Sequence, residues 1–264
     1  MSVPTLVAAG WIVAAVVMTA LWAWSVRLQN AGVVDVGWTA LVGGLAVFDA
    51  ALSPDGMAGR RVAIAAMMGI WSARLTVFLL VDRVFGKPED GRYAELRRAR
   101  GVRASSWFFW FFQAQAIAAV FFSLPALVSA SSPSPDWHPL EFAAMAIWVL
   151  AFAGEVTADR QLLAFKTNPN NKGETCQAGW WRYSRHPNYF FEWLIWVAYA
   201  LFASASPWGW LAWLCPATLL YLLFKVTGIP ATEAQALRSR GDAYRRYQQT
   251  TSVFVPWKVR GVRL

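Results

Sequence analysis

Long apolar runs separated by short polar connections extend along the whole chain, and they predict its elements. A transmembrane helix needs about 20 predominantly apolar residues to cross roughly 30 Å of hydrocarbon. Runs of this kind cover residues 4–26, 31–52, 62–81, 107–129, 139–163, 189–205 and 208–225. A further stretch, 231–247, mixes charged residues with Ala, Leu and Tyr, which is typical of an amphipathic helix on a membrane surface. The pattern therefore predicts an all-α polytopic membrane protein with about seven transmembrane helices in a single domain, residues 1–264.

The composition agrees with a membrane environment. Hydrophobic residues make up 57% of the chain, charged residues make up 15%, and there are 17 tryptophans. These values exclude an ordinary soluble domain. The first apolar run has no Lys or Arg ahead of it and is followed by Arg27, which predicts a retained helix rather than a cleaved signal. The two cysteines and two histidines are too few and too widely spaced for a disulfide framework or a zinc site, so we expect no metal.

Charge predicts how the helices are oriented. Most of the net charge of +9 comes from the connections 83–103 and 160–185 and from the segment 238–263, whereas the opposite loops contain Arg60 and Arg61. Because Lys and Arg stay in the cytoplasm, we predict an amino terminus outside and a cytoplasmic carboxyl terminus. Orientation and attraction to anionic membrane lipid explain a basic face of this kind. A nucleic-acid role is excluded, since the charges are divided among short loops without a recognisable binding motif.

Four ionisable groups lie at predicted membrane depth, namely Asp35, Arg74, Glu155 and Glu192. Such groups cost several kcal/mol unless they are paired or line a wet cavity. Asp35 either reaches interfacial water from a helix end or faces a cavity, where desolvation keeps it protonated and able to donate a proton. Arg74 needs an anionic partner, which is either a carboxylate such as Asp35 or Glu192 or a ligand phosphate.

A second polar group surrounds the start of the run 189–205. Arg182, Arg185 and His186 come just before Pro187, which suits the first turn of a helix. Since helix N-termini attract anions, we predict that this group holds phosphates. Asn188 and Glu192 are four residues apart and share a helix face. Glu155, Asp159 and Lys166 likewise form one stripe where the preceding helix leaves the membrane.

At this point the chain resembles a known family. The segments that carry the resemblance are "EDGRYAELR", "ADRQLLAFKTNPNNKGETC", "GWWRYSRHPNYFFEWLIW" and "GIPATEAQALRSRGDAYRRYQQTTSVFVPW". Together they are similar to the bacterial branch of the steroid 5-alpha-reductase-like membrane enzymes, from about Asp35 onward. The resemblance implies NADPH-dependent reduction of a carbon–carbon double bond conjugated to a ketone. It also implies that Asp159, Asn188 and Glu192 bind the dinucleotide together with Arg74 and Arg83, and that Asp35 engages the ketone oxygen.

Two positions depart from that family. Trp71 replaces a Tyr of the steroid-reducing members, and an indole donates a hydrogen bond but supplies no phenolic proton. Glu155 replaces an Asn. We predict that Asp35 and Trp71 are catalytic and that the cofactor-binding residues are Arg74, Arg83, Asp159, Lys166, Asn171, Lys172, Arg182, Tyr183, Arg185, His186, Asn188, Tyr189 and Glu192. The expected partners are a lipophilic small-molecule substrate and membrane lipid, and the resemblance implies a bacterial inner membrane with the NADPH site facing the cytoplasm.

Two alternatives stay open. The "RHPNY" segment, with a later Glu and the paired tyrosines of "YRRY", also resembles isoprenylcysteine carboxyl methyltransferases and related phospholipid methyltransferases, which bind S-adenosylmethionine. Those enzymes usually have a small residue where this chain has Phe191 and Glu192, and they lack the "NPNNKG" loop. The second alternative is a lipid carrier or transporter. Transporters often show two similar halves, and no internal repeat is evident here.

Overall fold

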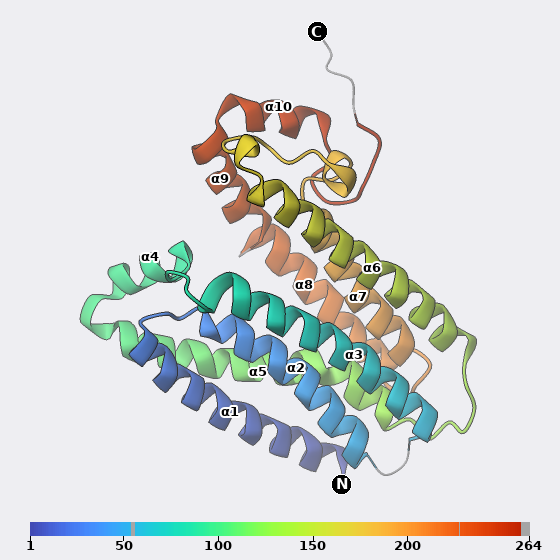
Figure 1. The fold of residues 1–264 in the computed structure, drawn as a ribbon. Coiled ribbons are helices and arrows are strands. Elements are labelled where there is room, and N and C mark those ends of the chain that lie inside the picture. The colour runs from blue at the N-terminus through green and yellow to red at the C-terminus, as the bar shows by residue number, and fades with distance from the viewer. Residues whose placement is uncertain (54–55, 227, 260–264) are drawn as a thin grey trace. The chain divides into compact units, whose positions relative to one another are not determined.

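A computed structural model describes residues 1–53, 56–226 and 228–259 of the chain. Within these ranges it is helical and contains no β-strand (Figure 1), which confirms the all-α prediction. The α-helices are α1 (Val3–Leu28), α2 (Val33–Leu52), α3 (Ala58–Leu79), α4 (Gly91–Arg100), α5 (Ala104–Ala130), α6 (Pro139–Thr167), α7 (Pro187–Ala203), α8 (Leu214–Lys225), α9 (Ile229–Arg240) and α10 (Asp242–Thr250).

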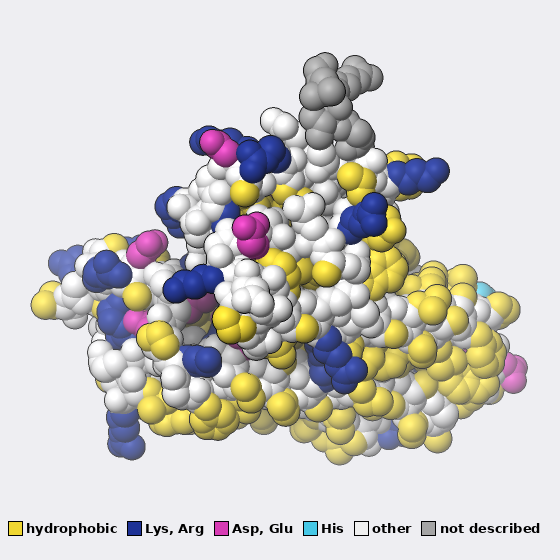
Figure 2. Space-filling model, turned by 45° about the horizontal axis from the view of Figure 1, so that its top comes forward, with side chains coloured by type: hydrophobic (Ala, Val, Ile, Leu, Met, Phe, Trp, Pro, Cys, Tyr) yellow, Lys and Arg dark blue, Asp and Glu magenta, His cyan; other side chains and the backbone are white. Residues whose placement is uncertain are grey.

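Among the described residues, six helical stretches are long and apolar enough to cross a membrane. They are Val3–Leu28, Val33–Leu52, Ala58–Val84, Gly91–Ala130, Pro139–Thr167 and Gly209–Arg240. The predicted span that is not among these six, 189–205, corresponds to α7, which has 17 residues and is therefore slightly shorter than the usual length of about 20. Hydrophobic side chains cover broad areas of the surface (Figure 2), as expected for an integral membrane protein. The orientation of the helices stays a prediction.

The chain forms two compact units. The amino-terminal unit contains Met1–Glu141 and Phe202–Ala212, and the carboxyl-terminal unit contains Phe142–Leu201 and Trp213–Leu264. In the amino-terminal unit α2 is the central helix, and it packs against α1, α3 and α5. Small residues allow this close packing, since a Cβ atom added to Gly43 would clash with Ser72 of α3. Helix association in membranes depends on such contacts between small residues.

A buried ion pair joins the start of α3 to the start of α6 within the amino-terminal unit. The Arg60 side chain and the Glu141 carboxylate are both fully buried, and Arg60 Nη2 lies 3.2 Å from Glu141 Oε2. Arg60 also donates to the carbonyls of Ser134 (2.7 Å) and Asp136 (2.6 Å). Arg61 donates to carbonyls at the end of α2. Both arginines of the loops predicted to face outside are therefore held by structural bonds.

Two differences from the predicted helix boundaries concern segments that carry charged residues. The stretch 231–247 was predicted as one amphipathic helix, but α9 and α10 are separated at Gly241, whose φ of +52° is one that L-residues rarely adopt. The helix predicted to end at residue 81 instead continues from α3 into a π-helical turn, η1 (Leu80–Val84). Turns of this type are frequent at functional sites, and η1 carries Arg83. Of the basic residues in the predicted cytoplasmic tail, Arg260 and Arg263 lie outside the described residues.

The Arg60–Glu141 pair provides the first testable prediction. Arg60→Ala should lower the free energy of unfolding by about 3–5 kcal/mol, because it leaves the Glu141 charge buried without compensation. Thermal unfolding in detergent measures the change. Arg98→Ala, at an exposed position of α4, should stay within about 0.5 kcal/mol of the parent. The double variant Arg60→Met, Glu141→Leu should lose less stability than Arg60→Ala. An equal or greater loss would show that the unpaired Glu141 charge does not cause the instability of Arg60→Ala.

Candidate functional site

Asp35 is the centre of a polar cluster in the amino-terminal unit. It lies in the first turn of α2 and forms an ion pair with Arg83. Tyr93 donates its phenolic hydrogen to Asp35 Oδ1 over 2.7 Å, and Arg92 Nη2 lies 3.8 Å from Oδ2. The Asp35 side chain is 25% exposed. Two cations and a phenol thus surround this carboxylate at the start of α2.

The segment that follows η1 is fixed to the start of α2 by polar bonds. Glu89 accepts two hydrogen bonds from Arg97, at 2.8 and 3.0 Å, and one from the backbone N–H of Ala31 at 2.8 Å. Asn30 accepts from the N–H of Gly32 (2.9 Å) and donates to the carbonyl of Arg83 (3.0 Å). These contacts hold α4 in the place where Tyr93 can reach Asp35.

Asp90 begins α4 by accepting a hydrogen bond from the backbone N–H of Arg92 at 3.0 Å. Burial alone would raise the pKa of Asp90, but hydrogen bonds from Arg92 and the positive charges of Arg92 and Arg83 hold it below its usual range. An ionised Asp90 suits a helix N-terminus. The cap is therefore present at neutral pH and stabilises the first turn of α4, which carries Tyr93.

Tyr93 was not among the predicted catalytic residues. It is buried, with 6% of its surface exposed, and its ring lies 6.3 Å from Phe108 and 6.1 Å from Phe111. The "EDGRYAELR" segment was the available signal, because it carries the family resemblance. Its chemistry became clear only from the hydrogen bond to Asp35, since the two residues are 58 positions apart.

The other predicted residues of the amino-terminal unit lie on α3. Trp71 is fully buried and meets Trp38 edge to face, with ring centroids 6.4 Å apart. Trp38 packs in the same manner against Phe122. Arg74 is half-buried, and its guanidinium lies over the ring of Phe78 at 5.7 Å. Trp71 is thus part of the aromatic core between α2 and α3.

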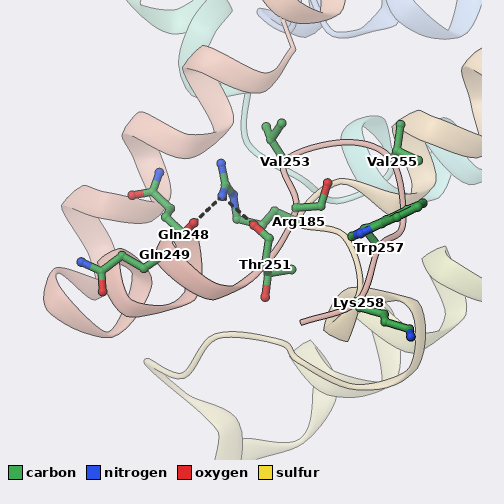
Figure 3. Close-up of a pocket in the computed structure, with 9 residues that line it drawn as sticks. Arg185, Gln248, Gln249, Thr251, Val253, Val255, Trp257 and Lys258 are labelled. Atoms are coloured by element: carbon green, nitrogen blue, oxygen red, sulfur yellow. Dashed lines mark hydrogen bonds between the residues drawn. The ribbon is translucent and has the colours of Figure 1, made fainter. Parts of the chain in front are cut away.

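In the carboxyl-terminal unit, Arg185 and His186 join the start of α7 to α9 and to the end of α10. Arg185 donates to Glu233 Oε1 (2.7 Å) and to the carbonyls of Gln248 and Thr251, both at 2.9 Å (Figure 3). His186 Nε2 lies 3.3 Å from the same Glu233 oxygen. The Arg185 side chain is 11% exposed. Both residues were predicted to bind phosphates, but here Arg185 Nε and Nη1 and His186 Nε2 make internal contacts.

The segment after α10 follows the residues before α7. Tyr247 donates to the carbonyls of Trp181 and Ser184. Ser184 in turn donates to the carbonyl of Phe254 at 2.6 Å, and the N–H of Trp257 donates to the carbonyl of Tyr183 at 3.0 Å. Burial raises the pKa of Tyr247 well above its usual value. Its phenol therefore stays a hydrogen-bond donor throughout the physiological pH range.

Two of the predicted dinucleotide-binding residues meet between α6 and α7. Asn188 Nδ2 donates to Asp159 Oδ1 over 3.2 Å. Glu192, one turn further along α7, accepts from the indole N–H of Trp196 at 2.9 Å. The structure therefore brings Asp159 and Asn188 together, as their positions in the family resemblance imply.

The remaining predicted residues of this unit lie around that pair in the sequence. Asn171 donates to the carbonyl of Phe165 (3.0 Å), and the Tyr189 hydroxyl lies 3.4 Å from Thr232 Oγ1. Tyr183 is 42% exposed. Three cations are exposed and form no ion pair within the described part of the chain, namely Lys166, Lys172 and Arg182. These cations are open to an anionic ligand. Across residues 1–53, 56–226 and 228–259, no group of three metal-ligating side chains occurs.

The bonds of Tyr247 provide the second prediction. Tyr247→Phe should destabilise the chain by about 1–3 kcal/mol, because two buried carbonyls lose their donor. Hydrogen exchange should accelerate at residues 251–257, which depend on this attachment. Tyr221→Phe is the matched control, since Tyr221 is 62% exposed. Unchanged exchange at 251–257 in Tyr247→Phe would show that the phenol does not hold the segment.

Comparison with known proteins identifies one family. The model of a family described as a protein of unknown function, DUF1295, matches residues 21–251. This family is related to the steroid 5-alpha-reductase-like proteins, so the resemblance predicted from the sequence is confirmed at that level. No curated protein and no solved structure matches the chain. Since the match covers most of the sequence, the chain belongs to the DUF1295 family.

Proposed function

We propose that this protein is a membrane reductase that uses NADPH to reduce a carbon–carbon double bond conjugated to a ketone in a lipophilic substrate. The observation that carries the proposal is the 2.7 Å hydrogen bond between Tyr93 and Asp35, beside Arg83 and Arg92. A phenol and two guanidinium groups are suited to an oxygen on which negative charge develops. Membership of a family related to steroid 5-alpha-reductase-like proteins supports the same chemistry.

The residues of the carboxyl-terminal unit fit a dinucleotide in part. The amide of Asn188 and the carboxylate of Asp159 are held together and provide donors and acceptors for a ribose or a carboxamide. Lys166, Lys172 and Arg182 are exposed and suited to phosphates. Arg185 and His186 fit less well, because Glu233 and two backbone carbonyls already engage Arg185 Nε and Nη1, and Glu233 also contacts His186 Nε2. When bound, NADPH supplies the hydride that the β-carbon of the enone accepts.

Tyr93 is the proposed proton donor. Addition of a hydride leaves the substrate one proton short, with negative charge on the former carbonyl oxygen. A phenol donates one hydrogen at a time, and in this structure Asp35 accepts it. Asp35 therefore orients the hydroxyl until a carbonyl oxygen takes its place as the acceptor. The positive charges of Arg83 and Arg92 stabilise the developing oxyanion. The proposal thus assigns to Tyr93 the phenolic role that Trp71 cannot perform.

Arg83 has two proposed partners. The family resemblance assigns it to the cofactor, and in the structure it pairs with Asp35. Both interactions use the same guanidinium, so a phosphate and Asp35 compete for it. Binding of the anionic cofactor would then release Asp35 from one of its counter-charges, which links the cofactor to the acidic group beside Tyr93.

The test of the reductase uses purified protein titrated with NADPH while nicotinamide fluorescence is followed, and a panel of lipophilic enones for turnover. Tyr93→Phe should bind NADPH with the parent's affinity but lose about 100-fold or more in turnover, the range of general acid catalysis. Tyr221→Phe, at an exposed position, should behave as the parent. Full turnover by Tyr93→Phe would exclude it as the donor, and absence of NADPH binding by the parent would exclude the reductase.

A parallel titration separates the methyltransferase alternative. A ligand at a hundredfold its dissociation constant stabilises a protein by about 2.7 kcal/mol. We expect NADPH, and not S-adenosylmethionine, to raise the unfolding temperature. The opposite result would favour the methyltransferase.

Competition for Arg83 gives a further prediction. Asp35→Asn keeps the shape of the side chain but removes its charge, so it should bind NADPH several-fold more tightly than the parent while losing turnover. Asp82→Asn, at an exposed position of η1, controls for a general change in charge near the same turn. Weaker NADPH binding by Asp35→Asn than by the parent would contradict the competition.

A further inference from the structure

A cavity of about 500 Å³ lies beside the last described segment of the carboxyl-terminal unit. The end of α10 and the residues after it form its walls (Figure 3). The residues that line it are Arg185, Gln248, Gln249, Thr251, Ser252, Val253, Val255, Trp257 and Lys258. This volume is sufficient for a small polar group rather than for a water molecule alone.

The lining of the cavity is cationic. It includes the guanidinium of Arg185 and the amine of Lys258, and it includes no Asp or Glu. Arg185 donates to Glu233 through its Nε and to the carbonyls of Gln248 and Thr251 through its Nη1. Its third nitrogen, Nη2, has no hydrogen-bond partner among the described residues. Ser252 and Gln249 add neutral polar groups. A phosphate ester matches such a set of donors.

The rim of the cavity is apolar and exposed. Val255 and Trp257, which line the cavity, are 48% and 68% exposed, although they lie within one short segment beside Lys258. Trp and Lys are the residues that anchor proteins at the boundary between membrane and water. A soluble phosphate has no apolar part that could pack against this exposed surface, whereas a phospholipid has acyl chains that could.

The same segment is attached to the end of an apolar helix. Phe254 packs against Leu223 of α8 and Ile229 of α9, and its ring centroid lies 5.2 Å from that of Phe224. Phe224 directly precedes Lys225, where α8 ends. Lys225 is also the first charged residue of the candidate span Gly209–Arg240, so the segment that lines the cavity packs against the end of the apolar part of this span.

We propose that this cavity is a binding site for the phosphate-bearing headgroup of an anionic phospholipid. Arg185 and Lys258 contact the phosphate, and the acyl chains lie against Val255 and Trp257. The site is independent of the proposed reductase activity. It also accounts for the exposure of the Trp257 indole, which the internal bonds of this segment do not explain.

The experiment measures lipid retention by native mass spectrometry of the purified chain, after exchange into detergent that contains phosphatidylglycerol or phosphatidylcholine. The parent should retain phosphatidylglycerol in preference to phosphatidylcholine. Lys258→Ala should retain about fivefold less phosphatidylglycerol, the effect expected from one cation at a membrane surface. Trp257→Ala should also retain less. The matched controls are Arg238→Ala and Trp210→Ala, since both positions are exposed and neither lines the cavity.

Three outcomes would overturn the proposal. The first is equal retention of the two lipids by the parent. The second is parental retention by both Lys258→Ala and Trp257→Ala. The third is displacement of the lipid by equimolar glycerol phosphate, which would show that the cavity takes a soluble phosphate ester. Both variants change exposed side chains, so their unfolding temperatures should match that of the parent, and the same measurement confirms that they are folded.

Discussion

A guanidinium next to hydrocarbon needs a counter-charge, and the two units of this chain are organised around such pairs. Arg60 binds Glu141, Arg83 binds Asp35, and Arg185 binds Glu233. The partners are 81, 48 and 48 residues apart in the chain. Because an unpaired charge there costs several kcal/mol, each pair fixes two distant segments to each other. The pairs therefore fix η1 to α2, the start of α3 to the start of α6, and the start of α7 to α9.

Much of the fold could be predicted from the sequence, because the thickness of a membrane limits how long an apolar helix can be. The helices α1, α2 and α5 coincide with predicted spans, and their ends differ by three residues or fewer. The break at Gly241 was not predicted, since glycine is permissive and only the φ of +52° shows that the helix is interrupted there. The pairing of Arg60 with Glu141 was also missed, because charges in loops were used only to orient the helices.

The candidate site could be predicted less completely than the fold. Asp159 and Asn188 meet as the motif implied, since both belong to one compact unit and to neighbouring segments. Tyr93 could not be found by spacing, because its approach to Asp35 depends on Glu89, which accepts hydrogen bonds both from Arg97 of α4 and from the N–H of Ala31 before α2. Periodicity describes one helix at a time, whereas this contact joins two helices through a third segment.

The pairs differ in how readily a ligand can replace one partner. Arg185 donates from two of its nitrogens to three acceptors, and its side chain is 11% exposed. Removing these acceptors would detach α9 and the end of α10 from the start of α7. Arg83 makes one ion pair through its side chain, which is 29% exposed, and it lies in a π-helical turn rather than in a regular helix. An anion can therefore compete for Arg83 at a lower cost in stability than for Arg185. Two arginines of equal charge can therefore have different roles. An arginine whose nitrogens mostly form internal hydrogen bonds is structural, whereas one with fewer such bonds can exchange its partner for a ligand.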